Sequence, residues 1–197
     1  DPELTAALGE AFVRGVQSQG VAACPKHFVT NDCETERHSV SVEVDPQTLA
    51  ECYLYPFERA VRVGGAWALM AAYHRLGGIY CAAHRGLLTE ILRDRWGFDG
   101  VVVSDWGGTY ETVGPALAGL DIEMPGPPKV RGAKLLGAIA EGAVEERHLD
   151  ASLQRVKRLA ERTAESLDAE APEKNSLRLG RNNTDTETTL WGSSSSP

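Results

Sequence analysis

Cysteine is scarce in this sequence, and long hydrophobic runs are missing from it. The 197 residues include 4 cysteines, and no two of these show the C-x-x-C spacing of a zinc or redox site. A disulfide-stabilised fold is therefore excluded, and the cysteines are expected to be small buried residues or free thiols. The apolar runs stay short of the roughly 18 residues that a membrane-spanning helix needs, so we predict no membrane partner.

Basic charge is also in deficit. Lysine and arginine total 20 against 28 aspartate and glutamate residues, which gives a net charge of −8. Such a surface repels phosphate backbones, so we predict no nucleic-acid partner. The chain is otherwise 42% hydrophobic and 24% charged, which is typical of a globular domain and excludes a fibrous or wholly disordered protein.

The first residues contain no basic segment followed by an apolar one, so no signal peptide is expected within them. Because the sequence does not begin with methionine, we expect the polypeptide to start upstream, and cytoplasmic and secreted locations are both compatible with it. Composition changes near residue 165, since 7 of the 33 residues over 165–197 are hydrophobic. We therefore predict a folded domain over 1–164 and a low-complexity, disordered tail over 165–197.

Helix signals and short apolar runs alternate along the predicted domain. Capping residues and helical spacing predict helices over 1–18, 45–63 with a kink at Pro56, 84–95, 131–141 and 148–163. Runs that are apolar on consecutive residues, as in strands covered on both faces, predict strands over 21–24, 67–72, 100–103 and 117–122. This alternation predicts an α/β fold of about four parallel β/α units. The length is below the roughly 250 residues of a closed eight-stranded α/β barrel.

Polar and aromatic residues follow the predicted strands. Lys26 and His27 come after the first strand, Tyr73 after the second, and Asp105 and Trp106 after the third. The carboxyl ends of parallel strands meet at one edge of a sheet and carry its ligand site, so we expect these side chains to line one pocket. Charged groups that hydrogen-bond hydroxyls, beside aromatic rings that offer an apolar platform, suit a neutral polyhydroxylated ligand.

Six motifs follow one another along the chain: Lys26-His27-Phe28-Val29, Glu34-x-x-Arg37, Met70-x-x-Tyr73, Trp96-Gly97-Phe98-Asp99-Gly100, Val103-Ser104-Asp105-Trp106 and Gly119-Leu120-Asp121-Ile122-Glu123-Met124-Pro125-Gly126. In order and approximate spacing they resemble glycoside hydrolase family 3, in particular its β-glucosidases, over about residues 1–163. The resemblance implies a partial (β/α)8 TIM-type barrel, corresponding to the second half of the family's N-terminal barrel domain. It also implies retaining hydrolysis of terminal nonreducing β-D-glucosyl or related residues, with no metal and no organic cofactor.

By this resemblance, Asp105 is the nucleophile that attacks the anomeric carbon and forms a covalent glycosyl-enzyme. From its position alone, Asp105 could equally cap a helix. Lys26 and His27 match the family's pair that binds sugar hydroxyls, although outside the motif a structural role would be the commoner one. Met70 and Tyr73 match residues that line the same nonreducing-end subsite.

The remaining motif residues are expected to have stacking or supporting roles. Trp106 is expected to stack on the sugar face. Glu34 and Arg37 are expected to brace their loop through a buried ion pair rather than touch sugar. Asp121 and Glu123 are expected to be structural residues of the last strand. Four residues depart from the family's pattern and leave the outer subsites and the aglycone preference open: Cys33, His74, Ala82 and Ala83.

The resemblance also implies parts that this sequence does not hold. In the family, the barrel begins upstream of the position of Asp1, and the general acid/base Glu comes from an α/β sandwich domain that follows the barrel. The expected partners are therefore a β-glucoside or oligosaccharide substrate, the missing barrel half and the sandwich domain. The alternative is a truncated noncatalytic half-barrel that acts only as a sugar-binding or assembly fragment. A phosphate-binding barrel is disfavoured, because no Gly-rich phosphate loop occurs near the last strands.

Overall fold

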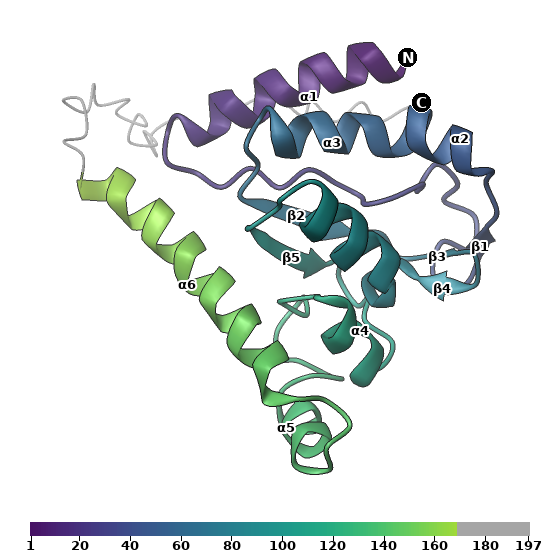
Figure 1. Cartoon of the computed structure of the whole chain (residues 1–197), viewed down its shortest axis with the longest axis vertical. Coiled ribbons are helices and arrows are strands. Elements are labelled where there is room, and N and C mark those ends of the chain that lie inside the picture. The colour runs from purple at the N-terminus through teal and green to yellow at the C-terminus, as the bar shows by residue number, and fades with distance from the viewer. Residues whose placement is uncertain (169–197) are drawn as a thin grey trace, which may run out of the picture.

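A computed structural model describes residues 1–168 and shows helices arranged around a small parallel sheet (Figure 1). The strands are β1 (Ser41–Val42), β2 (Ala68–Ala71), β3 (Arg75–Leu76), β4 (Ile79–Tyr80) and β5 (Val101–Ser104). The helical elements are α1 (Pro2–Gln17), α2 (Pro46–Thr48), the π-helical η1 (Leu49–Leu54), α3 (Tyr55–Arg62), the 3₁₀ turn η2 (Cys81–Ala83), the π-helical η3 (Gly86–Arg95), α4 (Val113–Ala118), α5 (Ala133–Ala140) and α6 (Glu146–Asp168).

Strands β2 and β5 form the centre of the sheet. They pair in parallel, with Ala68 opposite Val101 and Ala71 opposite Ser104. Both strands are buried on both faces except at their third residue, which is half-buried. The strands predicted over 67–72 and 100–103 from consecutive apolar residues are therefore confirmed.

The sheet continues on both sides of this pair through less regular segments. On one side, the carbonyl oxygens of Ala23 and Pro25 accept hydrogen bonds from β2, and a parallel bridge joins Phe28 to Ala71. Pro25 has no N–H to donate, so the ladder stays incomplete, and the strand predicted over 21–24 is an extended segment displaced towards residue 28. On the other side, a parallel bridge joins Ile122 to Val103.

The strand predicted over 117–122 is wrong for most of its length. Its first residues belong to α4, which ends at Gly119 with a φ of 95° in the left-handed region. A short apolar run can be either a buried strand or a buried helix, and here the glycine at the C-cap decides for the helix. The residues that follow Gly119 return to the sheet, where the N–H of Asp121 donates to Val102.

Helices α1 and α2 begin where their capping residues predict, whereas η3, α5 and α6 each begin two residues away from the predicted start. The Asp1 carboxylate accepts hydrogen bonds from the N–H groups of Glu3 and Leu4 at the start of α1, which packs along α3 (Figure 1). Asp45 caps α2 in the same way. The predicted interruption at Pro56 takes the form of a π-helical segment, η1, that ends just before it. A wider turn there accommodates a residue that cannot donate a backbone hydrogen bond.

A second, three-stranded sheet was not predicted from the sequence. It has the order β1-β3-β4, and β3 and β4 form a hairpin across Gly77 and Gly78, which have φ values of 56° and 84°. A two-residue turn with both φ angles positive favours glycine at both positions. Strands of two residues are too short for a hydrophobic pattern to reveal them.

The hydrophobic core lies between the parallel sheet and the helices that cover it. Phe28 is fully buried, with the rings of Phe57 and Trp96 edge-on at centroid distances of 5.1 and 6.0 Å. Helix α6 runs diagonally along the lower left side of the molecule (Figure 1) and ends at Asp168, beyond the domain boundary predicted at residue 164. The rest of the predicted tail, 169–197, lies outside the described residues. Within 1–168, no helix is both long and apolar enough to cross a membrane.

Candidate functional site

Asp105 directly follows β5, at the carboxyl end of the central strand pair. Its Oδ2 lies 3.1 Å from Nε2 of His27, and its Oδ1 accepts a 2.7 Å hydrogen bond from the backbone N–H of Trp106. The residue is 8% exposed, so the carboxylate is largely shielded but still reachable. His27 and Asp105, which follow the first and third predicted strands, are thus brought into contact across the end of β2.

The protonation state of His27 follows from its surroundings. Burial lowers the pKa of His27, and this effect outweighs the opposing effect of the Asp105 carboxylate. The imidazole is therefore neutral around pH 7. A neutral ring that faces an ionised carboxylate must carry its proton on the facing nitrogen, so Nε2–H donates to Asp105.

Tyr73 lies beside the same carboxylate. Its ring is 6% exposed, and its hydroxyl donates a 2.9 Å hydrogen bond to the carbonyl oxygen of Trp106. Burial, and next the Asp105 carboxylate, raise the pKa of Tyr73, so its phenol keeps its proton at neutral pH. The guanidinium carbon of Arg37 lies 4.8 Å from the ring centroid, in the range of a cation–π contact.

The ion pair of Arg37 and Glu34 is present but is not buried. Nη1 of Arg37 lies 2.7 Å from Oε2 of Glu34, and the two side chains are 42% and 62% exposed. The prediction that this ion pair is buried is therefore wrong. The loop lies at the rim of the site and leaves the Glu34 carboxylate in contact with solvent. Arg37 lowers the pKa of Glu34, and Asn31 donates a further hydrogen bond to it.

Three other predicted site residues differ in exposure. Lys26 is exposed, and its amine has no partner among the described residues. Met70 is half-buried on β2, and Trp106 is 64% exposed beside Asp105. Lys26 and Trp106 therefore present free hydrogen-bonding and stacking surfaces near the carboxylate.

Asp121 and Glu123 are engaged in supporting the fold, in agreement with the sequence prediction. The Asp121 side chain is 0% exposed and pairs with Nη2 of Arg93 at 2.9 Å and with Nη2 of Arg155 at 2.8 Å. Glu123 accepts hydrogen bonds from the backbone N–H groups of three consecutive residues, 129–131. Neither carboxylate is free to act on a ligand in this arrangement.

Two of the departures from the family pattern are internal. His74 is 1% exposed, and its Nε2 lies 2.8 Å from the hydroxyl of Thr30. Ala82 is buried too. The side chains of His74 and Ala82 do not reach the surface, so these two departures from the family pattern concern internal packing. Cys33, in contrast, is exposed.

Sequence reasoning missed an aromatic cluster beside Asp105. Nδ1 of His38 lies 3.0 Å from the hydroxyl oxygen of Tyr110, and the rings of Tyr110 and Tyr80 stack with centroids 4.0 Å apart. Burial is the main cause that raises the pKa of Tyr110 to about 12. These residues lie in loops and in a two-residue strand, where no periodicity signals them. The one signal in the sequence was the Gly77-Gly78 pair, which is typical of a hairpin turn and brings Tyr80 back to Arg75.

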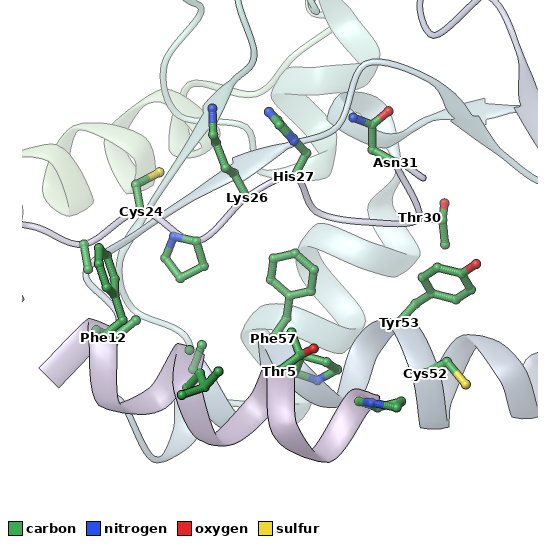
Figure 2. Close-up of a pocket in the computed structure, with 18 of the residues that line it drawn as sticks. Thr5, Phe12, Cys24, Lys26, His27, Thr30, Asn31, Cys52, Tyr53 and Phe57 are labelled. Carbon is green, nitrogen blue, oxygen red and sulfur yellow. The ribbon is translucent and has the colours of Figure 1, made fainter. Parts of the chain in front are cut away.

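A groove of about 980 Å³ lies on the other side of the extended segment from Asp105. Its floor and walls come from α1, α3 and residues 23–32, and its apolar lining includes Leu8, Phe12 and Phe57. Figure 2 shows the side chains of Lys26 and His27 directed away from α1, so they border the groove rather than fill it. Over 1–168 there is no group of three or more His, Cys, Asp or Glu side chains that could hold a metal ion.

Known proteins resemble this chain in sequence and in structure. It is 52% identical over 162 residues to a β-glucosidase of Rhizobium radiobacter, covering 82% of this chain and 20% of that protein. It is 43% identical over 156 residues to thermostable β-glucosidase B of Acetivibrio thermocellus, covering 79% and 21%. The crystal structure of β-glucosidase from Kluyveromyces marxianus in complex with glucose matches with a TM-score of 0.82 and 36% identity, covering 85% and 20%.

The chain thus spans about a fifth of the length of the curated relatives it matches. Residues 1–159 match the family model described as the glycosyl hydrolase family 3 N terminal domain. That range contains Asp105 and the residues around it, together with the whole parallel sheet. This chain belongs to glycosyl hydrolase family 3.

Proposed function

We propose that this chain is part of a glycoside hydrolase that removes terminal nonreducing β-D-glucosyl or related residues with retention of configuration. The observation that supports it most directly is the placement of Asp105. Its carboxylate follows a rigid buried strand, is oriented by His27 and by the Trp106 N–H, and remains accessible. The relatives named β-glucosidases support the substrate class.

Asp105 is proposed as the nucleophile. One of its oxygens attacks the anomeric carbon, the bond to the leaving-group oxygen breaks, and a covalent glycosyl-enzyme forms that water then hydrolyses. A nucleophile held in one orientation saves the entropy of aligning it with the substrate. The His27 hydrogen bond also keeps one oxygen occupied, so the carboxylate cannot rotate freely.

The neighbouring side chains are proposed to bind the sugar. Lys26 donates hydrogen bonds to its hydroxyls, the unprotonated Nδ1 of His27 accepts one, Trp106 stacks on its apolar face, and Met70 and Tyr73 close the nonreducing-end subsite. The free amine of Lys26 and the exposed ring of Trp106 support these roles. Glu34 and Arg37 hold the rim loop, and Arg37 supports the Tyr73 ring.

The second carboxylate of the mechanism is proposed to come from outside this chain. A retaining enzyme needs an acid/base carboxyl group about 5–5.5 Å from the nucleophile. Asp121 and Glu123 are held by arginines or by backbone N–H groups, so they are not available for it. We propose that an α/β sandwich domain supplies this group and that no metal or organic cofactor takes part.

The fold is proposed to be part of an eight-stranded barrel whose other half docks at the groove. Within the described residues, Cys24 and Lys26 make no backbone hydrogen bonds, so the edge of the parallel sheet is open there. Leu4, Leu8 and Phe12 of α1 are 58%, 62% and 70% exposed beside it. An unpaired edge next to exposed apolar side chains is suited to receive a further strand and helix.

The nucleophile is tested by covalent labelling of a form of the protein that includes the missing domains. A 2-fluoro β-glucoside slows the second step and traps the glycosyl-enzyme, and peptide mass spectrometry locates the modified residue. We expect the label on the peptide that contains Asp105. A label on another carboxylate would overturn the assignment.

The second candidate is a noncatalytic sugar-binding or assembly fragment. It is favoured by the lack of a free second carboxylate near Asp105 among the described residues. Calorimetry with glucose, run beside an assay with an aryl β-glucoside, separates the two candidates. Binding without turnover in every form of the protein would favour this second function.

A further inference from the structure

His38 connects the two loops that flank Asp105. It lies in the loop before β1, and its Nδ1 is 3.0 Å from the hydroxyl oxygen of Tyr110, which lies in the loop after Asp105. The His38 ring also packs on the ring of Tyr73, with centroids 4.2 Å apart and planes at 52°. One side chain thus contacts residues from both neighbouring segments.

Tyr73 in turn sets the position of the backbone next to the carboxylate. Its hydroxyl donates to the carbonyl oxygen of Trp106, the residue that follows Asp105. A Cβ atom on Gly108 would lie 3.1 Å from the Tyr73 ring, so the loop after Asp105 packs closely against that ring. A shift of Tyr73 would therefore move the Trp106–Gly107 peptide and, with it, Trp106, whose N–H holds Oδ1 of Asp105.

Tyr110 is itself fixed from the opposite side. The Tyr80 ring stacks on it at 4.0 Å with an interplanar angle of 28°, and the Tyr80 hydroxyl donates to the backbone carbonyl of His38 at 3.3 Å. Contacts therefore run from His38 to Tyr110, on to Tyr80 and back to His38. Arg75 adds a hydrogen bond to the Tyr80 hydroxyl at 2.8 Å, which holds this closed set against the hairpin.

We propose that His38 is a positioning residue that holds Tyr73, and through it the backbone of the loop after Asp105, in the geometry required for attack. This inference rests on the proposed function, in which Asp105 is the nucleophile. His38 acts through Tyr73 and Tyr110, and it needs no contact with the substrate. The hydrogen bond between His38 and Tyr110 joins the rim loop to the loop after Asp105, so both loops lose a restraint when this bond is removed.

The first test reads the environment of Tyr73 and needs no turnover. Ring-labelled tyrosine followed by NMR gives the titration of each phenol, with Tyr73→Phe for assignment. We expect His38→Ala to lower the pKa of Tyr73 towards its ordinary value, because the ring loses both burial and the nearby Asp105. Tyr110→Phe should have a smaller effect in the same direction, and the double variant should add little to His38→Ala.

The matched control is His148→Ala. His148 lies on α6, and its side chain has no partner among the described residues. It should leave the Tyr73 titration unchanged. If His38→Ala lowers the thermal midpoint but leaves the pKa of Tyr73 where it was, His38 is only structural and the proposal is overturned.

The second test uses the protein completed to a hydrolytically active form. We expect His38→Ala to lower kcat for an aryl β-glucoside about 10- to 100-fold with KM little changed, as misplacement of a reacting group does. His38→Gln, whose amide can still hydrogen-bond to Tyr110, should recover part of the loss. An unchanged kcat overturns the proposal. Absence of hydrolysis in every form counts against the proposed function instead, and the Tyr73 titration then still decides the role of His38.

Discussion

Nε2 of His27 and Oδ2 of Asp105 lie 3.1 Å apart and join two segments that are 78 positions apart in the sequence (105 − 27). Because burial keeps His27 neutral at pH 7, the contact is a single hydrogen bond from the imidazole to a carboxylate. The carboxylate thus gains orientation without the neighbouring positive charge that would weaken it as a nucleophile. The parallel order of residues 23–28, β2 and β5 makes this contact possible.

Replacing the proposed nucleophile should abolish turnover and leave the fold intact. Asp105→Asn keeps the size of the side chain and an oxygen that can accept the hydrogen bond, but its amide cannot form the glycosyl-enzyme. We expect kcat for an aryl β-glucoside to fall by several orders of magnitude in a form that includes the missing domains. Circular dichroism and the thermal midpoint should match the wild type. Near-wild-type hydrolysis by Asp105→Asn would refute the role of Asp105.

The sequence was sufficient to predict elements whose local signals agree with their packing. Strands β2 and β5 are apolar on consecutive residues because both faces are covered, and α1 begins at Asp1-Pro2 because that pair caps and starts a helix. The contact of His27 with Asp105 could also be anticipated, since strand ends in a parallel sheet gather on one side. The resemblance of the six motifs to those of the family added the expected roles of the site residues.

Features that depend on tertiary packing could not be predicted in this way. The apolar run over 117–122 predicts a strand, but its first residues belong to α4, which ends at Gly119 in the left-handed conformation. Exposure of the Glu34–Arg37 pair depends on how the rim loop lies, and spacing alone carries no information about it. His38, Tyr80 and Tyr110 come together only through the hairpin of β3 and β4, whose strands are too short to show a pattern.

The buried carboxylate of Asp121 should be the most costly acid to neutralise. Asp121→Asn leaves the guanidinium groups of Arg93 and Arg155 without their counter-charge, at side-chain exposures of 13% and 17%. Breaking a buried pair in this way costs about 3–5 kcal/mol in the free energy of unfolding. Urea denaturation followed by fluorescence measures the loss.

The control for that variant is Asp99→Asn. Asp99 also pairs with two arginines, Arg158 and Arg162, but its side chain is 50% exposed. Exposed pairs contribute only about 0–1 kcal/mol, so this variant should unfold at nearly the wild-type urea concentration. Equal losses from Asp99→Asn and Asp121→Asn would show that burial does not decide the strength of these contacts.

Acidification should destabilise the protein through histidines that are buried or half-buried. Burial lowers the pKa of His27, His74 and His84 below the value in the unfolded chain, so the unfolded state binds protons first as the pH falls. The stability that neutral histidines contribute is therefore complete above about pH 6.5 and is lost below it, until the folded-state pKa values are reached. The free energy of unfolding, measured from pH 7.5 to 5, should fall.

His74 allows this pH dependence to be assigned. It is 1% exposed and bonded to Thr30, so His74→Gln keeps a hydrogen-bonding group but removes the titration. The slope of the free energy of unfolding between pH 6.5 and 5 should become shallower in this variant. The control variant His148→Ala, at a half-buried histidine without a side-chain partner among the described residues, should leave the slope unchanged. A steeper or identical slope in His74→Gln would contradict the assignment.

The chain of residues 1–197 by itself should hydrolyse glycosides poorly and should self-associate. The proposed acid/base group lies outside it, and loss of a positioned proton donor typically costs about 10²–10⁴-fold in rate. The open edge at residues 23–28 and the exposed apolar side chains of α1 favour association of copies. Phe12→Ser should reduce that association, measured by light scattering, because Phe12 is 70% exposed and contributes the largest of these side chains. A monomeric wild-type chain with ordinary β-glucosidase turnover would refute the prediction and would direct attention to Glu34, the solvent-exposed carboxylate at the rim, as the acid.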